Sequence, residues 1–84
     1  MTPEKATEQQ LAEMLDTVRL EQRWSFRQLG EEIGIALNAS PIPEPTVRKF
    51  IQQAGDREFY ETTVYPIRKY LQHLHGAARV EVTK

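Results

Sequence analysis

The chain has 84 residues, 39% of them hydrophobic, which suffices for one small domain with a core of four or five helices. It has no cysteine, which excludes disulfides and thiolate metal sites, and no apolar run approaches the roughly 18 to 20 residues of a membrane span. The net charge of −1 argues against nucleic-acid binding, because domains with that function are usually strongly basic. However, residues 1–42 have four bases and seven acids, whereas residues 43–84 have seven bases and five acids, so we expect an anionic partner to meet the second half.

The N-terminal region predicts a soluble, cytoplasmic protein that begins with an amphipathic helix. The stretch MTPEKATEQQ lacks the basic-then-apolar order of a signal peptide. The helix begins either at Thr2 and Pro3 or at the capping box TEQQ of residues 7–10, and it ends near Gln22. Its apolar residues recur at helical spacing, at Leu11, Leu15 and Val18. We expect residues 1–7 to form a flexible segment.

A second helix is predicted to follow at once. Ser25 can cap it by accepting a hydrogen bond from the amide of Gln28, whose side chain reaches back. The inner stripe consists of Phe26, Leu29, Gly30 and Ile33. A glycine inside a helix costs about 1 kcal/mol relative to alanine, so Gly30 either marks the close approach of another helix or is merely tolerated.

The third helix is predicted over residues 45–54, after a turn that contains three prolines. Its apolar side consists of Val47, Phe50, Ile51 and Ala54. Gly55 is placed to end it as a C-cap. Arg48, Lys49 and Gln52 fall on the opposite side, which we expect to face solvent.

The fourth helix is predicted to begin between residues 61 and 63, because Pro66 is acceptable only near a first turn. The helical period is kept by Tyr60, Val64, Ile67, Leu71 and Leu74. Gly76 is predicted to end this helix. Residues 78–83 alternate apolar and polar side chains like a short β-strand, so residues 77–84 are interpreted as a C-terminal strand or tail.

Three stretches resemble, in their order and spacing, the helix-turn-helix domain of the phage Cro and repressor type, which is found in many small bacterial regulators. RLEQRWSFRQLGEEIG, residues 19–34, is similar to the end of that family's first helix and to its second helix. PTVRKFIQQAG, residues 45–55, resembles the recognition helix, and VYPIRKYLQHL, residues 64–74, resembles the helix after it. The resemblance covers roughly residues 11–74. It implies a compact, all-α domain of four to five helices.

The chain departs from the family pattern in two places. Phe26 stands where the family often has a glutamine that can touch a phosphate. The family also places about fourteen residues between the capping serine and the helix-opening threonine, whereas Thr46 comes twenty-one residues after Ser25. Two interpretations of the extra residues remain open. In the first, the second helix is one helical turn longer and ends near Asn38, and the remaining extra residues enlarge the loop. In the second, the helix ends at Gly34 and all seven extra residues belong to the loop.

The resemblance implies DNA contacts from the third helix. Arg48 and Lys49 are suited to guanine, and Gln52 is suited to adenine. Thr46, the backbone amides at the helix start and Arg27 are candidates for phosphate contacts. Gln53 completes the candidate set, and the alternative for this face is a merely solvated helix surface.

Catalysis, a cofactor and a metal site are all disfavoured by the sequence. Outside the threonines, only Ser25 and Ser40 offer hydroxyl nucleophiles, and Ser25 is expected to serve as a cap. His73 and His75 lie two residues apart on a helix and therefore point in different directions, without a third ligand beside them. We expect neither zinc nor an enzymatic activity.

Two functions follow from these patterns. The first is a sequence-specific transcriptional regulator that binds double-stranded DNA as a homodimer, with residues 78–83 pairing across the two-fold axis. The second is a protein-interaction module, similar to an antiactivator or antitoxin, that keeps the scaffold without binding DNA. In that case the apolar residues of segment 35–45 form the surface for a protein partner.

Overall fold

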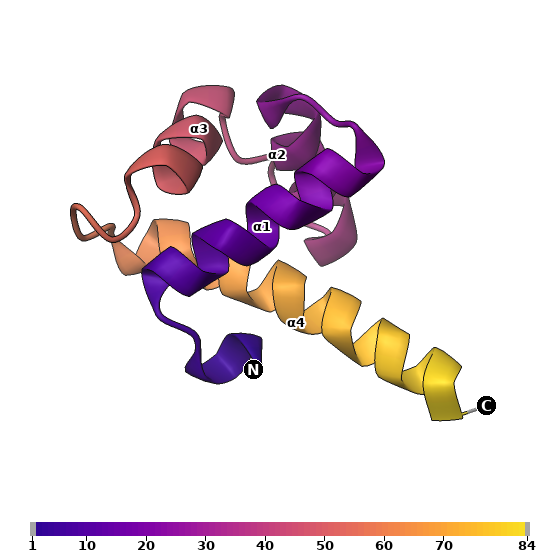
Figure 1. The fold of residues 1–84 in the computed structure, drawn as a ribbon. Coiled ribbons are helices and arrows are strands. Elements are labelled where there is room, and N and C mark those ends of the chain that lie inside the picture. Colours follow the sequence, from indigo (N-terminus) through magenta and orange to yellow (C-terminus); the bar gives the residue numbers. More distant parts are fainter. Residues whose placement is uncertain (1, 84) are drawn as a thin grey trace.

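The computed structural model describes the backbone of residues 2–83 and the side chains of residues 2–76, and it confirms the predicted all-α class (Figure 1). The elements in chain order are the 3-10 helix η1 (Pro3–Lys5) and the α-helices α1 (Glu8–Gln22), α2 (Phe26–Leu37), α3 (Glu44–Gln53) and α4 (Glu61–Thr83). The long helix α4 packs against η1, α1 and α2, while α3 packs against α1 and α2. Among the helices that the structure describes, none is long and apolar enough to cross a membrane.

The first two α-helices begin at the predicted caps. The Thr7 side chain accepts a hydrogen bond from the Gln10 amide at 3.2 Å, and the Gln10 side chain accepts one from the Thr7 amide at 2.8 Å. The Thr2-Pro3 signal is also used, because it starts the separate turn η1. Ser25 accepts from the Gln28 amide at 3.1 Å, without the predicted reciprocal bond.

The second helix takes the longer of the two predicted courses and ends at Leu37. Asn38 follows as its C-cap in the left-handed conformation, with φ 54°, which asparagine tolerates better than most residues. The Ala39 amide donates to the Gly34 carbonyl at 2.9 Å and closes the last turn. The extra turn is therefore helix, and the residues after it form the loop 38–43.

This loop returns along α2 and touches its backbone at both glycines. The Ile42 amide donates to the Gly30 carbonyl at 3.2 Å. A Cβ atom on Gly30 would overlap the Ile42 carbonyl oxygen, and a Cβ on Gly34 would lie 2.9 Å from the Cα of Pro41. Gly30 thus marks a close approach, as one interpretation held, but the backbone that approaches belongs to the loop. Val47 of α3 lies just beyond, with Cγ2 3.3 Å from the same added Cβ.

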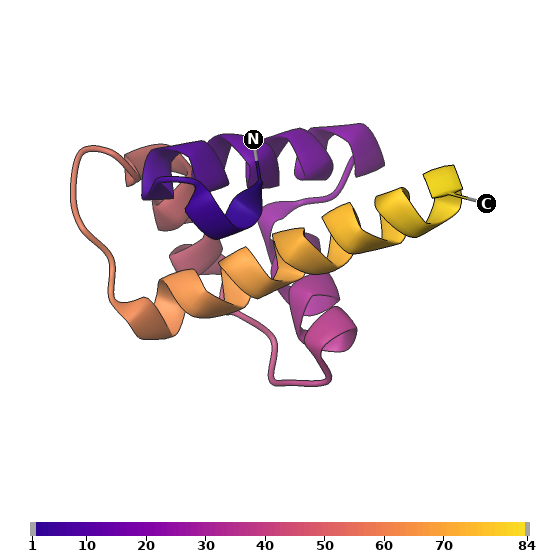
Figure 2. The ribbon, with the colours of Figure 1, turned by 90° about the horizontal axis from the view of Figure 1, so that it is seen from below.

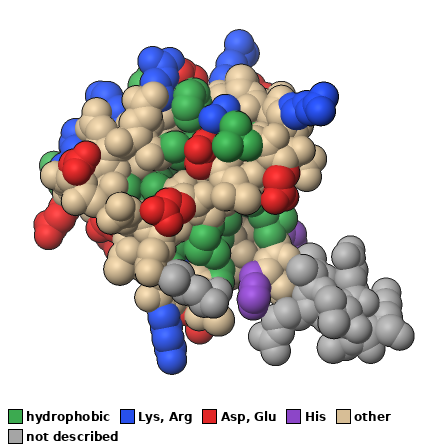
Figure 3. All heavy atoms as spheres, in the orientation of Figure 1, with side chains coloured by type: hydrophobic (Ala, Val, Ile, Leu, Met, Phe, Trp, Pro, Cys, Tyr) green, Lys and Arg blue, Asp and Glu red, His purple; other side chains and the backbone are tan. Residues whose placement is uncertain are grey.

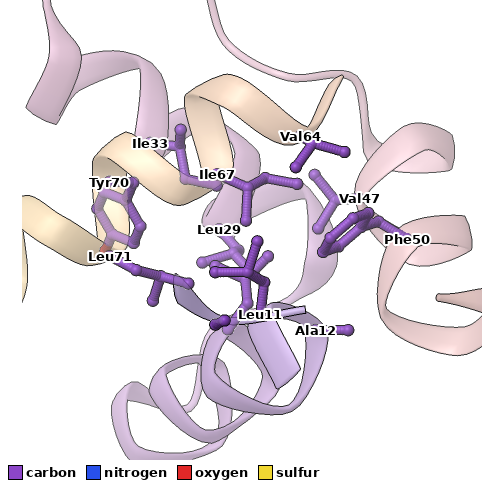
Figure 4. Packing of buried hydrophobic residues seen from close by; sticks show 12 residues of the cluster. Leu11, Ala12, Leu29, Ile33, Val47, Phe50, Val64, Ile67, Tyr70 and Leu71 are labelled. Carbon is purple, nitrogen blue, oxygen red and sulfur yellow. The ribbon is translucent and has the colours of Figure 1, made fainter. Parts of the chain in front are cut away.

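The core is assembled from all four α-helices and the N-terminal segment. Figure 4 shows its side chains converging from α1, α2, α3 and α4. The buried cluster consists of Ala6, Leu11, Ala12, Leu15, Leu29, Ile33, Val47, Phe50, Val64, Ile67, Tyr70 and Leu71. Burial raises the pKa of the Tyr70 hydroxyl, and the nearby charge of Glu32 raises it further. Tyr70 therefore stays neutral at physiological pH and packs as a core residue.

The predicted C-terminal strand was wrong, because α4 continues through Gly76 to Thr83. A strand of this length needs a partner strand, and the described residues form no sheet. Ala77 and Ala78 have high helix propensity and follow a helix that is already formed, so the segment extends it. Figure 2 shows the end of α4 reaching past the other helices. Residue 84, part of the predicted strand or tail, lies outside the described residues.

The N-terminal segment, predicted to be flexible, is packed against α4. Pro3 and Ala6 are buried. The Nη1 atom of Arg68 donates to three backbone carbonyl oxygens, those of Pro3 at 2.7 Å, Ala6 at 3.0 Å and Glu4 at 3.2 Å. Sequence periodicity gave no sign of this contact, because it joins residues more than sixty positions apart. Residue 1 lies outside the described part.

The close approach at Gly30 predicts a large difference between two glycine substitutions. We expect Gly30→Ala to lower the free energy of unfolding by about 2 kcal/mol, because the new methyl group meets backbone that cannot move aside. Gly76→Ala is the matched control. Its Cβ meets nothing within 4 Å, and alanine favours a helix by about 0.5–1 kcal/mol, so this variant is at least as stable as the parent. Urea unfolding followed by circular dichroism measures both, and equal stability of Gly30→Ala and the parent would contradict the contact.

The Arg68 contact predicts that Arg68→Met releases the N-terminal segment. Hydrogen bonds to a charged donor contribute about 1.5–3 kcal/mol, so we expect the amides of Lys5 and Ala6 to exchange hydrogen at least roughly tenfold faster. The exposed neighbour Lys69 provides the control variant Lys69→Met, which leaves these rates unchanged. Hydrogen exchange measured by NMR separates the two, and similar rates in both variants would show that Arg68 does not hold the segment.

Candidate nucleic-acid interface

The helix α3 is held in place by two buried residues on one side. Val47 and Phe50 are fully buried, and the Phe50 ring meets the edge of Phe59 with centroids 5.2 Å apart. After the C-cap Ala54, the chain turns at Gly55, where φ is 97°, a conformation that glycine adopts without strain. The helix spans residues 44–53, so it begins and ends one residue earlier than the predicted range 45–54. The burial of Val47 and Phe50 fixes its orientation.

The opposite side of α3 carries the predicted DNA-contacting residues. Arg48, Lys49 and Gln52 are exposed, as expected, whereas Thr46 and Gln53 are half-buried. Gln53 is also engaged within the protein, because its side-chain oxygen accepts from Arg57 at 3.4 Å. In Figure 3, Lys and Arg side chains stand along the upper rim of the molecule, where Figure 1 places α2 and α3, with Asp and Glu side chains between them.

Two of the predicted basic contacts are paired with acids one helical turn away. Arg48 forms an ion pair with Glu44 at the start of α3. Arg27, at the start of α2, forms one with Glu31 at 3.3 Å. Both pairs have the i, i+4 spacing that brings helical side chains together, so that spacing was the signal by which they could have been predicted. Among the described residues, Lys49 alone of the three predicted bases has no ion pair.

The backbone at the start of α3 offers few free hydrogen-bond donors. Pro43 and Pro45 have no N–H, and the Thr46 amide donates to the Pro43 carbonyl at 3.0 Å. The N-terminus of a helix binds anions through its unpaired amides, so prolines remove the reason to expect a phosphate here. The predicted phosphate contact by these amides is therefore reduced to the single N–H of Glu44, whose own carboxylate opposes it.

A shallow hollow of 280 Å³ between α1 and α3 adds negative charge beside this face. Its acidic lining residues are Glu13, Asp16 and Asp56, and it reaches Gln52 of α3. Arg19 neutralises part of this charge by an ion pair with Asp16 at 2.9 Å. These acids lie outside α3, so the residue pattern of that helix does not predict them. An anion is expected to approach α3 from the side away from α1.

The two histidines and Arg68 belong to α4 and not to this face. His73 and His75 are exposed, and no group of three His, Asp or Glu side chains within the described residues could hold a metal ion. The guanidinium of Arg68 donates to the N-terminal carbonyls and does not extend the basic side of α3. Comparison with models of known protein families found no match, and comparisons with curated proteins and with solved structures found none either. Interpretation of function therefore depends on these residues themselves.

Proposed function

We propose that the chain is a cytoplasmic, sequence-specific DNA-binding transcriptional regulator of bacterial or phage type, and that α3 is its recognition helix. One observation carries the proposal. The loop 38–43 returns the chain to Gly30, so that Val47 and Phe50 anchor α3 on the body while Arg48, Lys49 and Gln52 face solvent. These three side chains have the chemistry that reads guanine and adenine in the major groove. The extra residues lengthen α2 and form the loop after it, and α2 and α3 still pack against each other.

We further propose that two copies bind one operator. A single recognition helix reads only a few base pairs, and a dimer doubles the sequence that is read. The predicted pairing of strands at residues 78–83 is withdrawn, because that segment is helical. A symmetric operator with two half-sites about one helical turn apart is the arrangement to expect.

A protein-interaction module that does not bind DNA is the second candidate. The ion pairs of Arg27 and Arg48, the prolines at the start of α3 and the acids between α1 and α3 all weaken an anion-binding surface. These observations favour a domain in which α3 no longer binds DNA. The two functions differ in a property that is simple to measure.

Titration into mixed-sequence duplex DNA at two salt concentrations distinguishes the candidates. A regulator binds such DNA with micromolar affinity, and the affinity falls steeply with salt because phosphate contacts release counterions. Fluorescence anisotropy of a labelled duplex measures this. Absence of binding at low salt would overturn the DNA-binding function and leave the interaction module.

The Glu44–Arg48 pair predicts a gain of affinity from Glu44→Gln. The change removes a negative charge from the DNA-facing helix and frees Arg48, so we expect binding about fivefold tighter, which corresponds to about 1 kcal/mol. Glu4→Gln is the matched control, because it makes the same change of charge in η1, away from α3 in Figure 1. Equal effects of the two variants in the anisotropy titration would show that net charge alone matters and that α3 is not the contact.

A further inference from the structure

We infer that a groove between the end of α2 and the middle of α4 binds a partner protein through an acidic segment with apolar anchor residues. The α2–α4 groove has a volume of 540 Å³ and is lined by Leu37, Ala39, Tyr65, Pro66, Lys69, Gln72 and His73. Leu37 and Ala39 belong to the extra turn of α2 and to the loop after it. The insertion that leaves α3 in place thus forms one wall of this groove.

The apolar character of this surface is not explained by the core. Tyr65 is 53% exposed, although its neighbours Val64 and Ile67 are buried. A second hollow of 490 Å³, lined in part by Ile35 and Pro41, joins the groove at Ala39. Ile35 is 73% exposed, which is costly for a large aliphatic side chain that has no other role. The two hollows share the lining residue Ala39, and the second also contains the polar residues Glu31 and Asn38, with the Glu31 carboxylate in an ion pair with Arg27. Exposed apolar residues that gather beside a groove, as Tyr65 and Ile35 do here, are typical of a protein-interaction site.

The charge of the groove identifies the class of partner. Lys69 supplies the fixed charge, and its ammonium lies 5.5 Å from the centroid of the Tyr65 ring at the groove wall. Among the residues whose side chains the structure describes, none that lines this groove is a carboxylate. The groove therefore combines an apolar surface with an exposed cation. A partner segment fits it if its apolar side chains enter the groove and a Glu or Asp side chain pairs with Lys69. Nucleic acid fits less well, because its backbone would gain only one cationic contact and would cover apolar walls.

A second copy of the chain is also a poorer occupant. In a two-fold interface the same patch meets itself, so Lys69 would face a groove whose described lining residues offer it no carboxylate. Figure 2 places the end of α2 and its loop on one side of α4 and α1 on the other. The groove uses no residue of the α3 outer face, so this inference does not depend on DNA binding.

NMR titration of the ¹⁵N-labelled full chain with two synthetic peptides tests the inference. The first peptide is an amphipathic segment with Leu and Phe on one helical face and Glu on the other, and the second has Lys in place of every Glu. We expect the acidic peptide to shift the amides around Leu37, Ala39 and Tyr65 with a dissociation constant below about 1 mM. We expect the basic peptide to bind at least roughly tenfold more weakly.

Two charge-reversal variants complete the test. Lys69→Glu is expected to reverse the preference between the peptides, whereas Lys49→Glu on α3 leaves it unchanged; both side chains are exposed, so both variants should fold. Equal binding of the two peptides, or no shifts at millimolar acidic peptide, would overturn the inference. Shifts of the groove amides on simple concentration of the chain would assign the groove to self-association, and shifts caused by duplex DNA alone would assign it to nucleic acid. Either result also overturns the acidic protein partner.

Discussion

The position of α3 depends on a contact between two stretches of backbone that leaves no room for a side chain. At Gly30 the returning loop donates an amide to the helix carbonyl, and the carbonyl of Ile42 occupies the space that a Cβ would need. Gly34 admits Pro41 in the same way. Because the loop is held at both glycines, its two prolines, Pro41 and Pro43, further restrict its path. This contact therefore determines both the position and the orientation of α3, which follows the loop.

Much of the fold could be predicted because its signals are local. The side-chain caps Thr7 and Ser25 and the left-handed C-cap Asn38 act within one turn of the backbone, and the apolar period of each helix is visible over a few residues. The strand failed for a related reason, since a six-residue alternation is too short to exclude a helix that is already growing from Leu71 and Leu74. The contact of Arg68 with the N-terminal carbonyls could not be predicted, because nothing in either segment specifies the other.

The residues of the candidate site could be predicted from the sequence, but the charges that surround them could not. The exposed positions of Arg48, Lys49 and Gln52 follow from the helical period alone. The charge that an approaching ligand meets depends on neighbours in space, and Glu13 and Asp56 come from elements whose packing the sequence does not state. The last turn of α2 and the loop 38–43 lie near two different surfaces. One is polar and centred on α3, and the other is apolar and lies where α2 meets α4.

The three carbonyls held by Arg68 also have a consequence for the order of folding. The helices α1, α2 and α3 are built from contacts close in sequence, which form early because little chain must be closed. The segment from Pro3 to Ala6 has its guanidinium partner more than sixty residues away, on a helix that must already be in place. We expect this segment to pack against α4 last during folding and to detach first during unfolding. The beginning of the chain then covers a core whose helices are already packed.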